Sequence, residues 1–219
     1  MIEYDKDAIV YPYITEFLRN DIAPKSGILG EMQRYAEENS VPIVQPETAQ
    51  LLEVLVQLKR PERILEIGCA IGYSAMLMAE GLSQGGSITT LEWDEGMAEI
   101  ARKNIETAGL SEVIKVINDD AKVVLPTLSG EYDIIFLDGP KAHYIHMLND
   151  CVRLLKKGGI LIADNVLYKG MTADPEHVVR RKITIVKRLQ HFIKAQMQHP
   201  ELKAVLLPLG DGVTVAVKK

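Results

Sequence analysis

The sequence predicts an α/β fold: a doubly wound, mostly parallel sheet of seven strands, with helices before it and an antiparallel hairpin at its end. From residue 61 onward, short apolar runs alternate with helical patterns, which is typical of a parallel sheet covered by helices on both faces. Near the C-terminus, two apolar runs flank the glycine-containing turn at 210–212. Such a turn indicates a hairpin whose two strands run in opposite directions.

The first 60 residues are expected to be helical. We expect helices over 7–20, 26–39 and 47–60. Prolines separate or end these segments, because the residue before a proline avoids the helical region of backbone space. The third helix carries Leu51, Leu52, Leu55 and Leu58 at helical spacing, which predicts that one leucine face is buried.

Strands and helices then follow in alternation. Strands are expected at about 63–68, 87–92, 113–117, 132–138, 159–164, 203–208 and 213–217. Helices are expected at about 73–82, 95–108, 121–128 and 142–155, and a long one at 175–198. The long helix should bury a stripe formed by Val179, Ile183, Val186, Leu189, Ile193 and Met197.

Composition limits the class of protein. The chain has 219 residues, 47% of them hydrophobic and 25% charged, which fits one globular domain with a helical segment, 1–60, and an α/β core, 61–219. No apolar run reaches the roughly 18 residues of a membrane span, and the first residues lack a secretory pattern. The two cysteines, Cys69 and Cys151, make neither a disulfide framework nor a zinc cluster. We therefore expect a cytoplasmic protein.

A glycine-containing turn follows the first strand. It reads Glu66-Ile-Gly-Cys-Ala-Ile-Gly-Tyr-Ser74 and opens into a helix. Open α/β sheets bind ligands at the carboxyl ends of their strands, and glycine lets the backbone approach a ligand closely. Ala70 departs from the dinucleotide-binding fingerprint, which disfavours a nicotinamide-dependent dehydrogenase. A purely structural turn is the alternative.

Acidic residues end the next two strands. Glu92 follows the glycine turn by about 20 residues, where a carboxylate can accept hydrogen bonds from both hydroxyls of a ribose. Asp119-Asp120-Ala121 follows the third strand, where a carboxylate can reach an adenine amino group. One of these two aspartates is equally suited to capping the short helix that follows.

Three oxygen-bearing side chains end the fourth and fifth strands. Asp138 ends one strand, and Asp164 and Asn165 end the next. Two carboxylates and a carboxamide suit a hard divalent cation such as Mg²⁺. Lys141 starts the following helix beside this set, where it can serve as a base or can polarise a substrate oxygen.

The charge of the chain is unevenly distributed. Residues 1–140 carry 11 basic and 24 acidic side chains, whereas residues 141–219 carry 14 basic and 6 acidic ones. Basic residues recur along the long helix at Arg180, Arg181, Lys182, Lys187, Arg188 and Lys194, with Lys169 nearby. One cationic face of this kind fits a phosphate backbone, and the alternative is an ordinary solvated helix face.

Five segments together resemble the class I S-adenosylmethionine-dependent methyltransferases, within the cation-dependent O-methyltransferases that include the catechol and caffeoyl-CoA enzymes. They are Leu65-Glu-Ile-Gly-x-x-x-Gly-Tyr-Ser74, Leu91-Glu92, Asp120-Ala121, Asp138-x-x-Lys141 and Ala163-Asp-Asn-Val166. The resemblance extends over about residues 30–219.

The resemblance implies a role for each matching position. The pocket for S-adenosylmethionine would be lined by Val44, Glu66, Gly68, Ser74, Glu92, Asp120, Ala121 and Asp138. Asp138, Asp164 and Asn165 would hold Mg²⁺, and Lys141 and Asp138 would be the catalytic residues beside the acceptor hydroxyl. Gly139-Pro140 departs from relatives that have Ala-Ala or an aromatic residue there, which changes the expected acceptor pocket. A homodimer is also implied.

Within this family the chain resembles bacterial members that methylate 5-hydroxyuridine in tRNA. The resembling stretches include Arg34-Tyr-Ala-Glu-Glu38, the basic cluster at 180–182 and Pro208-Leu-Gly-Asp-Gly212. The implied product is 5-methoxyuridine at the wobble position of the anticodon, with tRNA held by Lys169, Arg180, Arg181, Lys182, Lys187 and Arg188. A metal that binds two neighbouring oxygens of the modified uridine could equally bind the two oxygens of a catechol, so a small-molecule acceptor is an open alternative. A non-catalytic RNA-binding protein is another.

Overall fold

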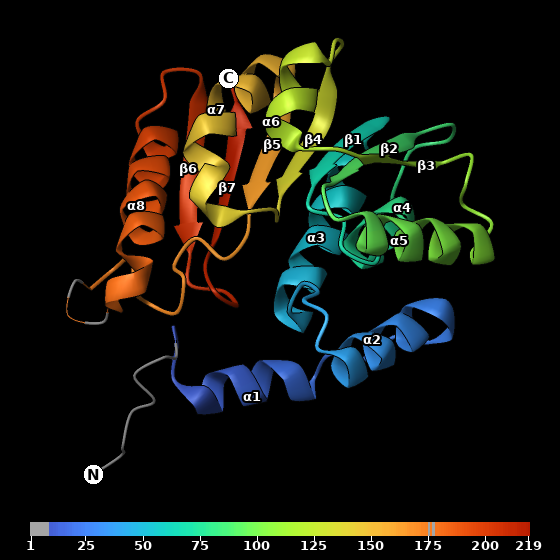
Figure 1. Ribbon diagram of the computed structural model, residues 1–219, viewed down its shortest axis with the longest axis horizontal. Helices are drawn as coiled ribbons and strands as arrows, with labels where there is room; N and C mark the ends of the chain where they lie inside the picture. The colour runs from blue at the N-terminus through green and yellow to red at the C-terminus, as the bar shows by residue number, and fades with distance from the viewer. Residues whose placement is uncertain (1–8, 175, 177) are drawn as a thin grey trace.

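A seven-stranded sheet forms the centre of the molecule, with helices on both of its faces (Figure 1). The computed structural model describes residues 9–174, 176 and 178–219. The strands are β1 Arg63–Ile67, β2 Ser87–Glu92, β3 Ile114–Asn118, β4 Tyr132–Leu137, β5 Leu155–Ala163, β6 Leu202–Leu207 and β7 Val213–Lys218. Their order is β3-β2-β1-β4-β5-β7-β6.

The predicted fold class is confirmed. Strands β1 to β5 pair in parallel, and β7 runs antiparallel to both β5 and β6, which is the expected C-terminal hairpin. The chain leaves β1 toward β2 on one side and later returns to β4 on the other. This reversal lies between β1 and β4, and it is the place where an open α/β sheet leaves a crevice at its carboxyl edge.

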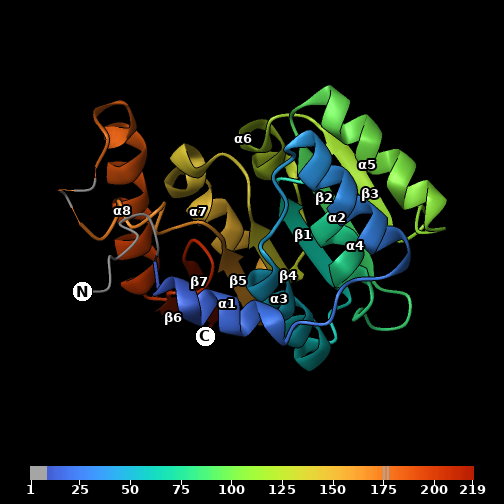
Figure 2. The ribbon, with the colours of Figure 1, turned by 90° about the horizontal axis from the view of Figure 1, so that it is seen from below.

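Helices lie on both faces of the sheet. They are α1 Pro12–Asn20, α2 Gly27–Asn39, α3 Pro46–Lys59, α4 Tyr73–Ala79, α5 Glu95–Thr107, α6 Ala121–Val124, α7 Tyr144–Leu154 and α8 Ile183–Met197. Short 3-10 helices are η1 Leu125–Thr127, η2 Lys141–His143 and η4 Arg180–Lys182. Figure 2 shows α7 and α8 on one side of the strands and α2, α4 and α5 on the other.

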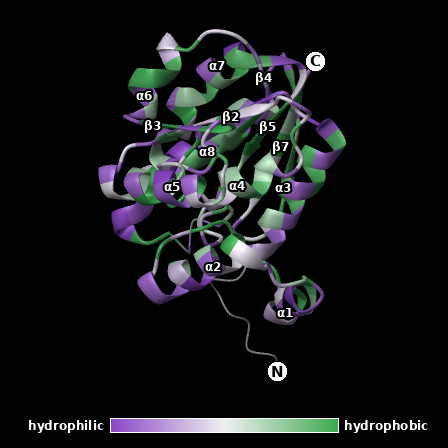
Figure 3. Cartoon of the chain, turned by 90° about the vertical axis from the view of Figure 1, so that its right-hand side faces the viewer, coloured by the Kyte–Doolittle hydropathy of each residue, from purple (hydrophilic) through white to green (hydrophobic). Residues whose placement is uncertain are grey.

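Alternation along the strands divides the core into two layers. Ile64 of β1 packs with Ile134 and Phe136 of β4 in the layer under α2 to α5. Leu65 of β1 and Ile135 of β4 point the opposite way, into the layer under α6 to α8. Figure 3 shows hydrophobic residues along the strands and hydrophilic outer surfaces on α2 and α5. Because both faces of the sheet are buried, the central strands need apolar residues at consecutive positions.

The last helix differs most from its prediction. The α-helix begins at Ile183, after η4, and the predicted start at 175 lies outside the described residues. Val179, Ile183 and Met197 of the expected stripe are 50%, 39% and 42% exposed. The buried residues of α8 are Val186, Leu189, Phe192 and Gln196. Phe192 lies on the buried face of α8, and its ring packs edge-on against the ring of Tyr144, with 5.3 Å between the two ring centroids.

Smaller differences concern element ends. The predicted start of the first helix at residue 7 lies outside the described residues, and α1 begins at Pro12. Helix α4 ends at Ala79 rather than residue 82, and Gly81 packs so closely that an added Cβ would lie 2.7 Å from Val56 Cγ1. Strand β5 begins at Leu155, four residues earlier than expected.

The predicted leucine face of α3 is only partly correct. Leu52 is fully buried, but Leu58 is 77% exposed, and Val56 is buried although it was not among the predicted residues. Helix α3 packs against α4, and Val56 near its C-terminal end also lies against Gly81, just beyond α4. Within the described residues, no helix is both long and apolar enough to cross a membrane.

The two leucines of α3 provide a matched test of this packing. Leu52→Ala should lower the free energy of unfolding by about 2–5 kcal/mol, because it leaves a cavity in the core. Leu58→Ala, on the same helix, should change it by less than about 0.5 kcal/mol. Urea denaturation followed by circular dichroism measures both, and equal effects of the two substitutions would contradict the packing of α3.

Candidate active site

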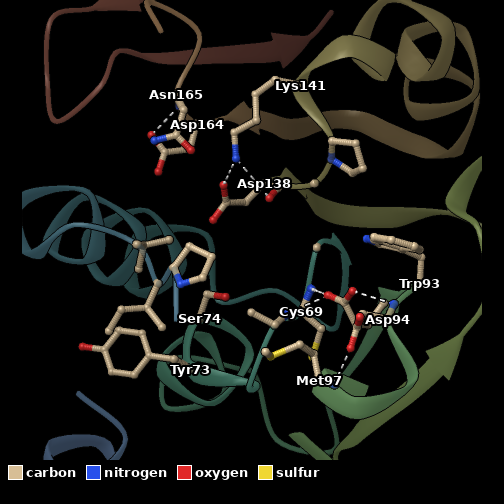
Figure 4. A pocket seen from close by; sticks show the side chains of 18 of the residues that line it. Cys69, Tyr73, Ser74, Trp93, Asp94, Met97, Asp138, Lys141, Asp164 and Asn165 are labelled. Carbon is tan, nitrogen blue, oxygen red and sulfur yellow. Dashed lines mark hydrogen bonds and ion pairs between the residues drawn. The ribbon is translucent and has the colours of Figure 1, made fainter. Parts of the chain in front are cut away.

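A cavity of about 550 Å³ opens at the carboxyl ends of the parallel strands. Eight of the residues proposed from the sequence line it: Val44, Gly68, Ser74, Glu92, Asp138, Lys141, Asp164 and Asn165. Figure 4 shows that Asp138, Lys141, Asp164 and Asn165 gather at one end, and that Cys69, Trp93, Asp94 and Met97 gather at the other. Residues from four strand ends therefore meet in one cavity, as the sheet order requires.

The glycine turn forms one wall of this cavity. Gly68 has a φ of +99°, and an added Cβ would lie 2.6 Å from the carbonyl carbon and oxygen of Asp138. The backbone after β1 thus lies directly against the backbone after β4, which leaves no room for a side chain at position 68. Ala70 has a φ of +44°, and this turn directs the N–H groups of Cys69 and Ala70 toward Glu92.

Glu92 organises the turn as well as lining the cavity. Its Oε2 accepts hydrogen bonds from the backbone N–H of Cys69 at 3.2 Å and of Ala70 at 2.8 Å. Its Oε1 accepts one from the N–H of Asp94 at 3.0 Å. The side chain is buried, so these charge-assisted bonds hold the ends of β1 and β2 in a fixed relation.

Glu66 lies behind the cavity wall and does not line the cavity, which corrects its expected place. It is fully buried, and its carboxylate accepts hydrogen bonds of 2.5 Å from the hydroxyls of Ser74 and Thr90. Burial raises the pKa of Glu66 to about 7. The side chain points to the helix side of β1, so it reaches the cavity only through Ser74.

A second cavity of about 330 Å³ adjoins the first. The two share Gly68, Trp93 and Pro140, and the second is further lined by Asp119, Asp120, Ala121, Lys122, His143 and Met147. The predicted residues Asp120 and Ala121 therefore lie beside the main cavity rather than inside it. The capping alternative holds for Asp120, whose Oδ1 accepts a hydrogen bond from the N–H of Lys122 at 2.9 Å.

Asp138, Asp164 and Asn165 come together because β4 and β5 are neighbours. The two strands pair up to Leu137 and Ala163, so Asp138 and Asp164 each stand one residue beyond the last pair. Burial raises the pKa of Asp138 above its ordinary value, although Lys141 opposes this. Burial and then the nearby charge of Asp138 raise the pKa of Asp164.

The oxygen donors of this set fit a hard divalent cation. Lys141 Nζ lies 2.9 Å from Asp138 Oδ1, so a single ammonium group faces two carboxylates that repel each other, one partly buried and the other, Asp164, fully buried. Among the described residues, no three His, Cys, Asp or Glu side chains form a metal cluster. The donors are two carboxylates and one amide. This set suits Mg²⁺ and leaves coordination positions of the ion for oxygen atoms of water and substrate.

The basic residues predicted for RNA line neither of these two cavities. Arg180, Arg181 and Lys187 are exposed on η4 and α8. Arg188 is half-buried and donates a hydrogen bond to the carbonyl of Ala142 at 3.4 Å. The remaining two have neighbours elsewhere. Lys182 lies 5.7 Å from the centre of the Tyr168 ring, and Lys169 lines a separate cavity with Arg19 and Asp211.

Several lining residues were not expected from the sequence. Tyr73, Trp93, Asp94 and Met97 all line the main cavity. Each lies within five residues of a predicted strand end or glycine turn. The expectation that ligands bind at the carboxyl ends of the strands would have included these residues if it had been applied to the loop after each strand. Trp93 is 69% exposed at the junction of the two cavities, where a ligand that spans both would contact it.

Comparisons with known proteins agree with this geometry. A protein-family model described as O-methyltransferase matches residues 21–219. A catechol O-methyltransferase of Niastella koreensis is 36% identical over 182 residues, which cover 80% of this chain and 82% of the relative. A caffeoyl-CoA O-methyltransferase of Stellaria longipes is 27% identical over 224 residues, which cover 97% of this chain and 87% of the relative.

Solved structures show the same fold. The O-methyltransferase from Bacillus cereus in complex with SAH superimposes with a TM-score of 0.83 at 29% identity, and the match covers 94% of this chain and 97% of that one. The family model, the sequence relatives and the fold agree, and we conclude that this chain belongs to the O-methyltransferase family.

Proposed function

We propose that this protein transfers a methyl group from S-adenosylmethionine to a hydroxyl of a small catechol-like or caffeoyl-like acceptor, with a divalent cation at Asp138, Asp164 and Asn165. The observation that carries the proposal is the set of oxygen donors beside Lys141, within a cavity that extends along the glycine turn. The catechol and caffeoyl-CoA O-methyltransferases among the relatives support this acceptor class.

The two adjoining cavities suit an elongated cofactor. The Bacillus cereus O-methyltransferase is in complex with SAH, the demethylated form of this cofactor. A carboxylate oxygen can accept more than one hydrogen bond, so Glu92 can hold ribose hydroxyls while it still binds the backbone N–H groups of the turn. The adenine would then enter the second cavity beside Asp120 and Ala121, and the sulfonium end would lie toward Asp138.

The chemistry follows from the charges. The acceptor oxygen forms a bond to the methyl carbon while the carbon–sulfur bond breaks, and the electron pair of that bond neutralises the sulfonium. When bound, the divalent cation lowers the pKa of the acceptor hydroxyl and fixes its direction. Lys141 Nζ, 2.9 Å from Asp138 Oδ1, is placed to stabilise the oxyanion as an ammonium group, or, where it enters the reaction as the free amine, to accept the released proton. Val44 and Pro140 add apolar surface to the lining of the cavity.

Removing the carboxylate of Glu92 tests the cofactor assignment. Glu92→Ala should weaken S-adenosylmethionine binding about 30- to 150-fold, because charge-assisted ribose hydrogen bonds worth roughly 2–3 kcal/mol are lost. Glu95→Ala, an exposed glutamate three residues further along the chain, is the control. Isothermal titration calorimetry measures both, and unchanged affinity in a folded Glu92→Ala variant would show that the cofactor lies elsewhere.

Metal removal tests the cation. EDTA should abolish methyl transfer and Mg²⁺ should restore it. Asp164→Asn should lower activity at least about 100-fold in a folded protein, since loss of a ligand should exceed the 10- to 100-fold effect of losing a supporting group. Asp21→Asn, an exposed aspartate at the end of α1, should have wild-type activity. Full activity in EDTA is the result that would refute the metal site.

A tRNA acceptor is the second candidate function, and one surface feature favours it. Residues 177–200 contain no aspartate or glutamate, and Arg180, Arg181 and Lys187 are exposed there. A small phenol needs no such surface, whereas an anticodon stem has phosphates to place against it. This candidate keeps the same chemistry, with the 5-hydroxyl of 5-hydroxyuridine as the acceptor and 5-methoxyuridine as the product. A non-catalytic RNA-binding role would leave the donor set of Asp138, Asp164 and Asn165 without a purpose.

One double variant separates the two acceptors. Arg181→Glu with Lys187→Glu should leave methylation of 3,4-dihydroxybenzoate unchanged. If tRNA is an acceptor, the same variant should weaken tRNA binding and lower the slope of log affinity against log salt by about 1.5. Lys103→Glu with Lys115→Glu, both exposed near the opposite edge of the sheet, keeps the net charge matched. Equal tRNA methylation by both double variants across salt concentrations would refute the tRNA candidate.

We also propose that two copies of the chain form a homodimer through helix α1. Tyr13 and Phe17 of α1 are 58% and 67% exposed, and none of the residues of α1 is buried. Exposed aromatic residues on one short helix support an interface with a second copy of the chain.

A further inference from the structure

A buried tyrosine lies beneath the two carboxylates of the candidate metal site. Tyr144 is the first residue of α7 and is fully buried. Its hydroxyl lies 3.0 Å from the carbonyl oxygen of Leu137 and 3.2 Å from that of Asp164. Leu137 immediately precedes Asp138, so one hydroxyl joins the two chain segments that carry the carboxylates.

This contact stands where strand pairing stops. The last paired residues of β4 and β5 are Leu137 and Ala163. Beyond them, the N–H of Asp164 donates to the carbonyl of Leu137 at 3.0 Å. The Tyr144 hydroxyl adds a second donor to that same carbonyl and also reaches the carbonyl of Asp164. The backbones of the two carboxylate-bearing residues are therefore joined by more than the sheet provides.

The ring of Tyr144 is fixed from the side away from the cavity. Phe192 of α8 is fully buried and packs against it edge-on, with 5.3 Å between ring centroids and 67° between ring planes. Tyr144 also follows η2 directly, and η2 carries Lys141, whose Nζ lies 2.9 Å from Asp138 Oδ1. The core thus places the hydroxyl, and the hydroxyl lies against the ends of both strands.

We propose that Tyr144 is a positioning residue that fixes the spacing of Asp138 and Asp164 for the divalent cation. The inference rests on the metal site of the proposed function and adds a residue that acts on it from the core. Mg²⁺ demands near-ideal octahedral ligand geometry, so small shifts of a ligand backbone weaken binding, and Mn²⁺ takes the same kind of oxygen ligands. The charges of the two carboxylates repel each other, and beyond the last strand pair a single backbone hydrogen bond among the described residues, from Asp164 to Leu137, joins the two segments besides the Tyr144 hydroxyl.

The test is the metal affinity of Tyr144→Phe. This substitution removes the hydroxyl and keeps the ring. We expect Mn²⁺ binding, measured from the electron paramagnetic resonance signal of free Mn²⁺ in the presence of SAH, to weaken about 10- to 100-fold. The affinity for SAH should stay within about twofold of wild type, because the glycine turn and Glu92 are not touched. The Mn²⁺ concentration that half-activates methyl transfer should rise by the same factor as the dissociation constant.

Tyr132→Phe is the matched control. Tyr132 is also buried, but it is the first residue of β4 and so lies at the end of the strand opposite to the site. Its loss of a hydroxyl should leave Mn²⁺ affinity unchanged. Phe192→Leu is a second variant, which keeps the hydroxyl and loosens the ring, and it should weaken Mn²⁺ binding by a smaller factor. If Tyr144→Phe does not fold, the Mn²⁺ affinities of Phe192→Leu and Tyr132→Phe are compared instead. Weaker binding by Phe192→Leu alone supports the proposal, and equal affinities contradict it.

Three results would overturn the proposal. Wild-type Mn²⁺ affinity in folded Tyr144→Phe would show that the sheet alone positions the ligands. An equal loss of SAH and Mn²⁺ affinity would show a general structural role. If the wild-type protein binds no Mn²⁺ and works in EDTA, the metal site of the proposed function fails first, and this outcome is visible before any variant is made.

Discussion

The site depends on two carboxylates that the fold holds close together against their mutual repulsion. Asp138 and Asp164 stand at adjacent strand ends, and burial raises the pKa of each. An isolated pair of this kind would favour taking up a proton or separating, because the charged forms are poorly solvated there. Lys141 offsets part of this charge. The remaining negative charge is what makes the cavity attractive to a cation and to a positively charged sulfonium, so one electrostatic feature serves both proposed ligands.

One wall of the cavity is formed by backbone rather than by side chains. Gly68 lies so close to Asp138 that an added Cβ would overlap the carbonyl group. Glu92 then binds the N–H groups of Cys69 and Ala70, so the turn is held from the neighbouring strand. The same carboxylate that is proposed to bind ribose also keeps the turn open for it. This shared use explains why an acid at this strand end has both a structural and a ligand-binding reason to be present.

The N-terminal helices complete the site from outside the sheet. Arg19 of α1 donates hydrogen bonds of 3.0 Å and 2.9 Å to the two carboxylate oxygens of Glu47, and one of 3.0 Å to Gln45. Gln45 and Val44 belong to the segment that lines the cavity. Glu47 is buried, so this two-point contact is stronger than an ordinary surface ion pair. A helix with no buried residues is thereby attached to the wall of the cavity.

The sequence by itself determined the succession of strands and helices along the chain, and the strand ends at which polar residues stand. Apolar runs and glycine turns are local signals, and they correctly indicated that Gly68, Glu92, Asp138 and Asp164 would meet at one edge of the sheet. Only the tertiary structure decided which way a side chain points or what it contacts. Glu66 faces Ser74 and Thr90 behind the wall, and Asp120 caps a helix.

The same limit applies to the basic helix and to the core beneath the site. Spacing placed Arg188 with Arg180 and Arg181, but α8 packs on η2 and brings Arg188 to the carbonyl of Ala142. The burial of Phe192 and the link from Tyr144 to two strand ends depend on residues far apart in the sequence. Hydrophobic periodicity records that a face is buried but carries no information about its partner. The physical reason is that packing partners are chosen by contacts between distant segments, which form only once the chain has folded.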